Sequence, residues 1–436
     1  MNKMYRLIRL IFSNPSITIR LLTWQRVKNG CRAILYNQGN WGLLLKRYSA
    51  IYSNKDLSDI LSKVKTEKYI GDVFLFPAID WSFRFQRPQH IARELSNKGY
   101  RVFYISTVPL IAKKKSNYEI QDIPVPGVLL VQLSSGNFRA PDMYMDELTD
   151  GEVLNLKKSF YELIHEFSVS KYTLLVQHPF WQKIVSAVND HNIIYDCIDF
   201  HDGFFAKVNN SLRLSEKILA DKARTLVVTS DYLLQNFEEN AKNFVIRNGC
   251  EYERFGRVAR LKSKDKNIIG YIGAVSDWFD GKLLYSVAKL RPDLRFEIYG
   301  AVTDPYILKS RQMANVKFHG EIAYENVPET IATFDVCLIP FKIKELTLAT
   351  NPVKVYEYLA VGRPVVATKL PELAELENLD VFCADKLEEF CKFIDKALLI
   401  SDLPERINIR KRWASENDWS NRVDELSKLP PFCEKV

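Results

Sequence analysis

The sequence predicts an α/β protein with two doubly wound parallel sheets. From residue 72 onward, short apolar runs alternate with helix-like segments, which is the pattern of βαβ units. The pattern repeats after a polar, turn-rich stretch at 247–254, and 436 residues are enough for two or three domains. We therefore expect two Rossmann-like domains in tandem. A cleft should separate the carboxyl edges of their sheets, where open α/β sheets bind ligands.

The first domain is predicted at 71–245. Its apolar runs are short and nearly continuous, as expected for strands that are buried on both faces. The expected strands are 72–76, 101–105, 173–177, 193–195 and 225–229. The expected helices are 88–98, 151–167, 179–189, 212–223 and 231–240.

The second domain is predicted at 262–405, after a linker at 246–261, and shows the same alternation. Its expected strands are 268–272, 295–299, 316–319, 335–339 and 364–368. Its expected helices are 280–290, 304–313, 324–333, 352–361 and 385–400. A helical segment at 406–436 is expected to cross back to the first domain.

The amino-terminal extension, 1–70, differs from the rest of the chain in charge. Residues 1–50 carry nine Lys and Arg side chains and no Asp or Glu, although the net charge of the whole chain is only +8. Such a localised charge argues against a nucleic-acid binder and for one anionic partner. Two interpretations stay open: amphipathic helices whose basic faces lie on an anionic membrane, or a helical arm that packs on the body.

The cysteines and the apolar runs bear on location. The seven cysteines are odd in number, scattered and without a CxxC pair, which is typical of reduced thiols in a cytoplasmic protein. No run of 18 apolar residues occurs, and Arg6 and Arg9 interrupt the first apolar stretch. We therefore expect neither a spanning helix nor a signal peptide.

Residues 350–368 suit a helix that binds a nucleoside diphosphate. Pro352 fits the first helical position, and the free amides at a helix start favour phosphate. Lys354 and Glu357 are three residues apart and share a helix face, so they can offer a cation to phosphate and a carboxylate to ribose hydroxyls. A surface ion pair between the two explains the same spacing, and the residues alone leave both interpretations open.

The sequence lacks the common motifs of metal and nucleophilic catalysis. No Walker A loop, GxGxxG, GxSxG or HExxH occurs. His and Cys do not recur at metal-ligand spacing, and Asp199 and Asp202 follow a strand, where caps or loop residues are expected. We therefore expect neither a metal nor an organic cofactor.

Five stretches of the chain, taken in order, resemble one enzyme family. Residues 71–420 are similar to GT-B glycosyltransferases of the large retaining family 4, which includes bacterial enzymes of teichuronic-acid and O-antigen synthesis. The segment that begins at Asn351 is specific to this family, whereas the other four support the resemblance only when they are taken together. The stretches are 81–92, 195–199, 245–249, 269–273 and 351–366.

The resemblance implies a sugar-nucleotide donor in the second domain and an acceptor in the first. In the family motif a glutamate binds the donor ribose, and that position is Glu357. A second glutamate, eight residues earlier, normally lies near the donor sugar, but Ala349 stands there. The resemblance then leaves the backbone amides near Thr350 and Asn351 as the replacement contacts.

The family's phosphate-binding pair of cations is also incomplete. Lys282 is the only cation close after Gly273 in the sequence. We therefore expect Lys354 to carry more of the phosphate charge, together with helix dipoles and without a metal.

On the acceptor side, the resemblance points to the loop and first helical turn after the first strand. Arg84, Arg87 and His90 lie there, where such enzymes meet donor phosphate or acceptor. A structural ion pair is the alternative for Arg87.

Three further side chains follow later strands of the same domain. His178 ends a strand and is expected to point into the cleft, where the resemblance suggests a hydrogen bond near the reacting sugar. Asp199 and His201 follow the next strand and are expected to orient the acceptor hydroxyl. A loop histidine satisfied by its neighbours is the alternative for His178.

The combined expectation is a cytoplasmic glycosyltransferase at the inner face of a bacterial membrane. It would move a sugar from a nucleotide-diphosphate donor to a lipid-linked surface glycan, with retention of configuration, and residues 1–50 would supply the membrane address. Two alternatives stay open: a sugar-nucleotide epimerase or phosphorylase of the same fold, and a non-catalytic subunit, which the departure at Ala349 favours.

Overall fold

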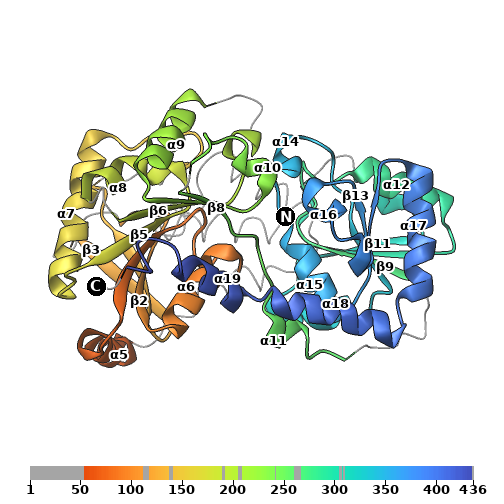
Figure 1. Cartoon of the computed structure of the whole chain (residues 1–436), viewed down its shortest axis with the longest axis horizontal. Coiled ribbons are helices and arrows are strands. Elements are labelled where there is room, and N and C mark those ends of the chain that lie inside the picture. Colours follow the sequence, from red (N-terminus) through yellow and green to blue (C-terminus); the bar gives the residue numbers. More distant parts are fainter. Residues whose placement is uncertain are drawn as a thin grey trace, which may run out of the picture.

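The chain forms two lobes, each with a parallel sheet between helices (Figure 1). The computed structural model describes residues 54–110, 117–136, 141–188, 192–204, 209–240, 242–259, 267–303, 307 and 310–434. The predicted fold class is confirmed, whereas the predicted amphipathic segments within 1–50 lie outside the described residues. No helix in the described part of the chain is long and apolar enough to cross a bilayer.

The first lobe contains an eight-stranded sheet in the order β3-β4-β2-β1-β5-β6-β7-β8. Neighbouring strands are parallel except β3 and β4, which form an antiparallel pair. The strands are β1 (Gly71–Phe76), β2 (Tyr100–Ile105), β3 (Tyr118–Val125), β4 (Val128–Leu133), β5 (Tyr172–Val176), β6 (Ile193–Cys197), β7 (Thr225–Val228) and β8 (Asn243–Val245). The helices are α5 (Asn54–Thr66), α6 (Arg87–Asn97), α7 (Asp150–Glu166), α8 (Gln182–Val188), α9 (Asn210–Lys222), α10 (Asp231–Leu234), and the 3₁₀ turns η1 (Pro179–Trp181) and η2 (His201–Phe204).

The sequence did not predict β3, β4 or β8, and it made α10 too long. Pro124 lies inside β3, and proline in an apolar run argues against a central strand. The structure resolves this conflict by placing β3 at the edge of the sheet, where one side of the strand needs no partner.

The second lobe contains a six-stranded parallel sheet in the order β11-β10-β9-β12-β13-β14, which is the doubly wound order 3-2-1-4-5-6. The strands are β9 (Ile268–Ile272), β10 (Arg295–Tyr299), β11 (Val316–Gly320), β12 (Val336–Ile339), β13 (Val365–Thr368) and β14 (Val381–Ala384). The helices between them are α12 (Gly281–Leu290), α13 (Val327–Ala332), α14 (Glu345–Leu348), α15 (Val353–Val361), α16 (Pro371–Ala374) and α17 (Leu387–Ile400). The linker holds the short α11 (Tyr252–Phe255).

Three predictions for this lobe need correction. Strand β14 was not predicted, and Pro352 is the N-cap residue of α15 instead of its first helical residue. Gly362 ends α15 with a left-handed φ of 84°, a conformation that glycine adopts at low cost. Within the predicted helix 304–313, the described residues form only the 3₁₀ turn η4 (Ser310–Gln312).

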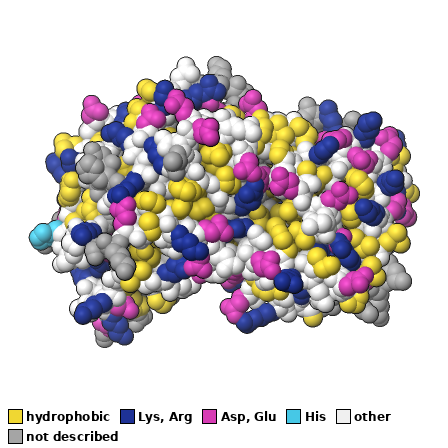
Figure 2. Space-filling model, viewed as in Figure 1, with side chains coloured by type: hydrophobic (Ala, Val, Ile, Leu, Met, Phe, Trp, Pro, Cys, Tyr) yellow, Lys and Arg dark blue, Asp and Glu magenta, His cyan; other side chains and the backbone are white. Residues whose placement is uncertain are grey.

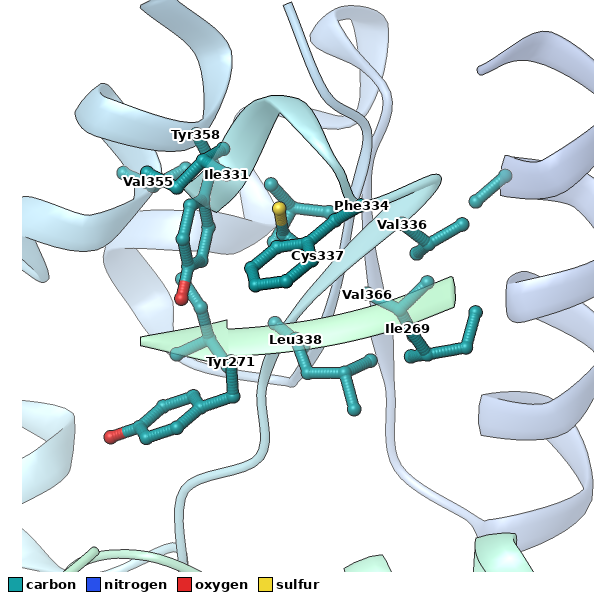
Figure 3. Packing of buried hydrophobic residues seen from close by; sticks show 14 of the residues in the cluster. Ile269, Tyr271, Ile331, Phe334, Val336, Cys337, Leu338, Val355, Tyr358 and Val366 are labelled. Carbon is teal, nitrogen blue, oxygen red and sulfur yellow. The ribbon is translucent and has the colours of Figure 1, made fainter. Parts of the chain in front are cut away.

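The core of the second lobe lies on both faces of its sheet, against α13 and α15 on one side and α12 and α17 on the other. Figure 3 shows Phe334 packed with Ile331, Cys337 and Tyr358 beside the sheet residues. A Cβ at Gly270 in β9 would lie 2.0 Å from the Phe334 ring, so the absence of a side chain there lets this ring approach the sheet. The Tyr358 hydroxyl accepts a hydrogen bond from the Ile272 amide at 3.0 Å and so ties α15 to the end of β9.

The carboxyl-terminal helices join the two lobes. Helix α18 (Pro404–Glu416) packs on α15 of the second lobe, and α19 (Trp419–Ser427) packs on α6 of the first (Figure 1). Trp419 is fully buried and stacks on the His90 ring, with ring centroids 4.9 Å apart. Residues 404–427 therefore make a strap across the lobes.

Candidate active site between the lobes

The strand order reverses once in each sheet, between β1 and β5 and between β9 and β12. Ligands of doubly wound sheets bind outside the carboxyl ends of strands at such reversals. Arg84 follows β1, His178 follows β5, and Gly273 follows β9. Lys, Arg, Asp and Glu side chains mix where the two lobes meet (Figure 2).

Gly273, Lys354 and Glu357 form what we call the donor cradle. A Cβ added at Gly273 would lie 2.1 Å from Cε of Lys354, so the lysine side chain lies directly over this glycine. Gly273 has a φ of +152°, and its carbonyl oxygen would be 1.9 Å from a Cβ at Gly300. The loops after β9 and β10 therefore approach each other and Lys354 closely only because both positions are glycine.

Burial shapes the charges of the donor cradle. It lowers the pKa of Lys354, against the opposing attraction of Glu357. It raises the pKa of Glu357 to about 7, against the opposing attraction of Lys354. Both side chains are half-buried, and no direct ion pair joins them among the described residues. The surface ion pair that the spacing also allowed is therefore not formed.

Arg84 brings a second cation to the donor cradle from the other lobe. Its guanidinium forms an ion pair with Glu321, after β11, at 2.8 Å. Arg84 also lies near enough to Lys354 to lower the pKa of that lysine. Two cations that repel each other across the junction favour an anion between them.

The other predicted donor residues lie elsewhere. Lys282 is exposed in the first turn of α12, and the contacts described for Gly273 and Lys354 do not include it. The Thr350 hydroxyl donates to the Leu346 carbonyl at 2.7 Å. The sequence alone could not place Lys282, because a helix start close in sequence to Gly273 need not point at it.

Asn351 belongs to a different group, which we call the hinge network: Arg87, Asp196, Asn248, Asn351 and Glu372. The Asn248 amide donates to Asn351 Oδ1 at 2.9 Å, and Asn248 Nδ2 donates to the Asn351 carbonyl at 2.7 Å. Asn351 Nδ2 in turn donates to Glu372 Oε2 at 2.8 Å. The side chain and carbonyl of Asn351 are thus occupied by the linker and by α16, so only its amide remains for a donor.

Arg87 is the other centre of the hinge network. Its Nη2 and Nε bond both carboxylate oxygens of Asp196 in β6, at 2.7–3.2 Å, and its Nη1 donates to Asn248 Oδ1 at 3.3 Å. The Arg87 and Asp196 side chains are 4% and 0% exposed. Arg87 therefore forms the structural ion pair that was the alternative interpretation. Its guanidinium is occupied by these partners, so the predicted contact with phosphate does not fit its position.

His90 is also a packing residue. Its ring lies between Trp419 and Phe85, and burial lowers its pKa well below the usual value. The predicted contact with phosphate or acceptor therefore does not fit its position, because the ring joins α6 to the strap at 404–427.

Tyr144, His178, Asp199 and His201 gather at the ends of β5 and β6, in what we call the histidine pocket. The rings of His178 and His201 lie 4.6 Å apart, and Tyr144 packs edge-on against His178 at 4.6 Å. His178 Nδ1 accepts from the Phe180 amide at 3.1 Å, and its buried Nε2 has no partner among the described atoms. Burial raises the pKa of Asp199 to about 7. Tyr144 was not predicted, since no motif surrounds it.

The histidine pocket adjoins the second lobe through η2. A Cβ at Gly203 in η2 would lie 2.8 Å from Cβ of Leu346 in α14. Ala349, which follows α14, is fully buried, and its carbonyl accepts from the Ser230 hydroxyl at 2.6 Å. A glutamate at this position would be buried in the lobe contact, and Glu345 is exposed, so neither offers the carboxylate that the resemblance leads one to expect.

Comparisons with known proteins agree with this arrangement. Residues 266–399 match the family model "Glycosyl transferases group 1". A curated relative from Bacillus subtilis, named "Putative teichuronic acid biosynthesis glycosyltransferase TuaH", is 24% identical over 275 residues, which are 57% of this chain and 69% of the relative.

Solved structures share the two-lobed fold. Sucrose-phosphate synthase from Thermosynechococcus elongatus has a TM-score of 0.64 at 14% identity, covering 82% of this chain and 98% of its own. Anabaena HepE has a TM-score of 0.56 at 15% identity, and the match covers 83% of this chain and 99% of the HepE chain. At these identities the likeness concerns the fold. The family match in the second lobe, the curated relative and the fold together identify a glycosyltransferase with the GT-B fold, and its second lobe carries the group 1 glycosyltransferase domain.

Proposed function

We propose that the chain transfers a sugar from a nucleoside-diphosphate sugar, held in the donor cradle, to a glycan acceptor at the first lobe. The single observation that carries the proposal is the Lys354 side chain lying across Gly273, with the half-buried carboxylate of Glu357 one helical turn away. A lysine over a glycine loop suits a diphosphate, and a carboxylate at that distance suits the ribose hydroxyls.

The ligands bound in two structural neighbours support a nucleotide-sugar donor. The Anabaena HepE structure contains UDP and glucose, and an Escherichia coli trehalose-6-phosphate structure, with a TM-score of 0.59 at 12% identity, contains UDP-2-fluoro glucose. The name of the Bacillus subtilis relative refers to teichuronic acid biosynthesis, which supports a cell-surface glycan as the acceptor class.

The proposed chemistry depends on a departing diphosphate. Charge builds up on that group as the bond to the sugar breaks, and prearranged cations in a partly dry site stabilise it. Lys354 and Arg84 are the cations placed for this role, one on each lobe, so lobe closure would bring both to the phosphates. We infer no need for a metal in this step.

The acceptor is proposed to meet the histidine pocket. The unpartnered Nε2 of His178 is a donor for a sugar hydroxyl, because Nδ1 already accepts from the Phe180 amide. The carboxylate of Asp199, with a pKa of about 7, can accept a proton from an attacking hydroxyl or orient it. A lipid-linked acceptor and a membrane address in residues 1–50 complete the proposal.

A thermal-shift screen against UDP-, GDP- and dTDP-sugars tests the donor. A ligand that binds only the native state raises the melting temperature, by an amount that grows with its concentration above Kd. The shift should disappear in Glu357→Ala and persist in Glu345→Ala, which removes an exposed carboxylate of α14. If no nucleotide sugar shifts the wild-type protein, or both variants behave alike, the assignment of the donor cradle is wrong.

Membrane attachment is tested separately. Full-length protein should sediment with anionic vesicles, and a variant without residues 1–50 should stay in the supernatant while keeping its response to the nucleotide sugar. Equal sedimentation of both forms would reject the membrane address.

A further inference from the structure

Three potential metal ligands meet behind the histidine pocket. They come from three elements: Cys197 ends β6, His201 begins η2, and Glu216 lies in the middle of α9. One ligand atom from each lies within 4.8 Å of the other two, and this is the one such group among the residues that the structure describes. No sequence motif indicates this group, because the spacing between His201 and Glu216 matches no common metal-binding pattern.

The His201 ring is the observation that points to a ligand. Its side chain is only 3% exposed, and neither ring nitrogen has a hydrogen-bond partner among the described atoms. A neutral imidazole always carries one donor and one acceptor, and leaving both unpaired in a dry site destabilises the fold. A native fold seldom keeps such a side chain without a bound group to satisfy it.

The spacing of the other two ligands already matches a metal. The Cys197 thiol donates a hydrogen bond to Glu216 Oε1, and the two atoms lie 3.6 Å apart. In a tetrahedral zinc site, with bonds of about 2.3 Å to sulfur and about 2.0 Å to oxygen, the two ligand atoms lie about 3.5 Å apart. The His201 nitrogen lies within 4.8 Å of both atoms, so the imidazole has to approach them by no more than about 1.5 Å to complete the set.

The surroundings also hold the glutamate as a ligand. The Tyr195 hydroxyl donates to Glu216 Oε1 at 2.6 Å and fixes the orientation of the carboxylate. Such outer hydrogen bonds accompany the ligands of most protein metal sites. Arg213 and Asp202 form an ion pair with each other beside Glu216, so their charges nearly cancel there.

We propose that Cys197, His201 and Glu216 bind a zinc-type divalent cation, with a fourth position open to water. One thiolate, one imidazole and one carboxylate are a donor set that zinc accepts, whereas calcium and magnesium require oxygen ligands. Binding replaces the thiol proton of Cys197, and that of Glu216 where it is protonated, and both are released to water.

The metal would have a structural role and would not act on the donor. It would tie η2 to β6 and α9, and η2 is the element of the first lobe that touches α14 of the second. The cation would thereby fix the loop that carries Asp199. It would also remove His201 from the acceptor contacts, since its free nitrogen would face the metal.

Cobalt substitution tests the site directly. The full chain is purified with chelator, then titrated with Co²⁺, which gives a near-ultraviolet thiolate charge-transfer band when a cysteine is a ligand. We expect a band that saturates at one equivalent, disappears when Zn²⁺ is added, and is lost in Cys197→Ser. The control Cys337→Ser removes an equally buried thiol in the core of the second lobe and should keep the band.

A second variant guards against misfolding. Glu216→Gln keeps the size of the side chain and the hydrogen bond from Tyr195, and it should weaken zinc binding at least about tenfold, as expected for the loss of a charged ligand. Zinc should also raise the melting temperature of the wild-type protein but not of this variant. No charge-transfer band, a band that survives Cys197→Ser, or unchanged zinc affinity in Glu216→Gln would each overturn the proposal. None of these outcomes depends on the donor assignment.

Discussion

The donor cradle and the hinge network differ although they share two short stretches of chain. In each stretch, one residue faces the cradle and another, three positions away, belongs to the network. Arg84 faces the cradle and keeps its side chain 31% exposed, whereas Arg87 is buried against Asp196. Lys354 lies over Gly273 in the cradle, whereas Asn351 is bonded to Asn248 and Glu372. Polar residues in the same turn of chain thus lie in the proposed donor site in one case and in the hinge network in the other.

The difference lies in how completely each group is satisfied by the protein itself. Buried polar groups of a stable fold find protein partners, and every nitrogen of Arg87 does so. In the donor cradle, burial disfavours the charged forms of both Lys354 and Glu357, and the protein does not fully compensate it. Incomplete compensation is the mark of a site that awaits a ligand.

The comparison is tested most strongly by Arg87→Ala. The variant leaves the fully buried carboxylate of Asp196 without its partner, and breaking a buried pair costs about 3–5 kcal/mol. We expect a large fall in the melting temperature, or insoluble protein, measured by thermal unfolding without ligand. Arg87→Lys keeps the charge but loses the two-point geometry, so it should fold with a smaller loss. A stable Arg87→Ala protein that fails only in donor binding would show that Arg87 belongs to the donor site and not to the hinge network.

Lys354→Ala should have the opposite profile. Loss of a half-buried cation from a diphosphate site is worth about 3 kcal/mol, so kcat/KM for the donor should fall about 100-fold. Stability without ligand should not fall, because burial already disfavours the charged lysine.

Lys282→Ala sharpens this test, because the sequence and the structure disagree about it. If the exposed lysine of α12 is remote from the phosphates, kcat/KM should change less than about twofold, as for most surface substitutions. If kcat/KM fell equally in Lys282→Ala and Lys354→Ala, Lys282 would belong to the donor site, as the sequence predicts.

The fold was predictable because its signal is repeated along the chain. Ten apolar runs with helical segments between them identify two doubly wound sheets, and each expected strand has its counterpart. Three of the four strands that were not predicted, β3, β8 and β14, lie at sheet edges, where burial on one side only weakens the apolar pattern. The fourth, β4, lies inside its sheet, between β3 and β2.

The site was predictable only where a residue's role follows from its local geometry. Lys354 and Glu357 share a helix face whatever else the chain does, so the sequence alone predicts that they lie close together. Arg87 and His90 depend on partners more than 100 residues away, Asp196 and Trp419, which no local pattern reveals. The group of Cys197, His201 and Glu216 could not be predicted for the same reason, because its glutamate comes from α9 and not from the stretch of chain that contains the other two residues.

Gly273→Ala is expected to have a smaller effect than Lys354→Ala. The added methyl group would lie 2.1 Å from Cε of Lys354, but this is a flexible side chain that can move aside. We expect KM for the donor to rise about tenfold, which is about 1.4 kcal/mol, with kcat less affected. Steady-state kinetics with the identified donor measure this, and an unchanged KM would show that the lysine does not need its position over Gly273.

Glu357→Gln should give the smallest effect and the most specific one, because it depends on pH. The pKa of Glu357 is raised to about 7 in the folded protein, against 4.5 for an ordinary glutamate. Between these values the native state holds a proton that the unfolded chain has lost, so this group makes the protein less stable as pH rises from about 4.5 to 7. Glutamine has no charge to bury, and at pH 8 the variant should melt a few degrees higher, at about 2–4 °C for each kcal/mol gained.

Donor binding should move in the other direction. An ionised carboxylate accepts hydrogen bonds from two ribose hydroxyls better than a neutral acid does, so KM of the wild-type enzyme should fall as pH rises through 7. In Glu357→Gln the KM should be higher and flat over the same range. A variant that is stabler at pH 8 yet binds the donor less well would show that the cradle gives up stability for recognition, which the fully bonded hinge network does not. A pH-dependent KM that persists in the variant would assign the titration to another group.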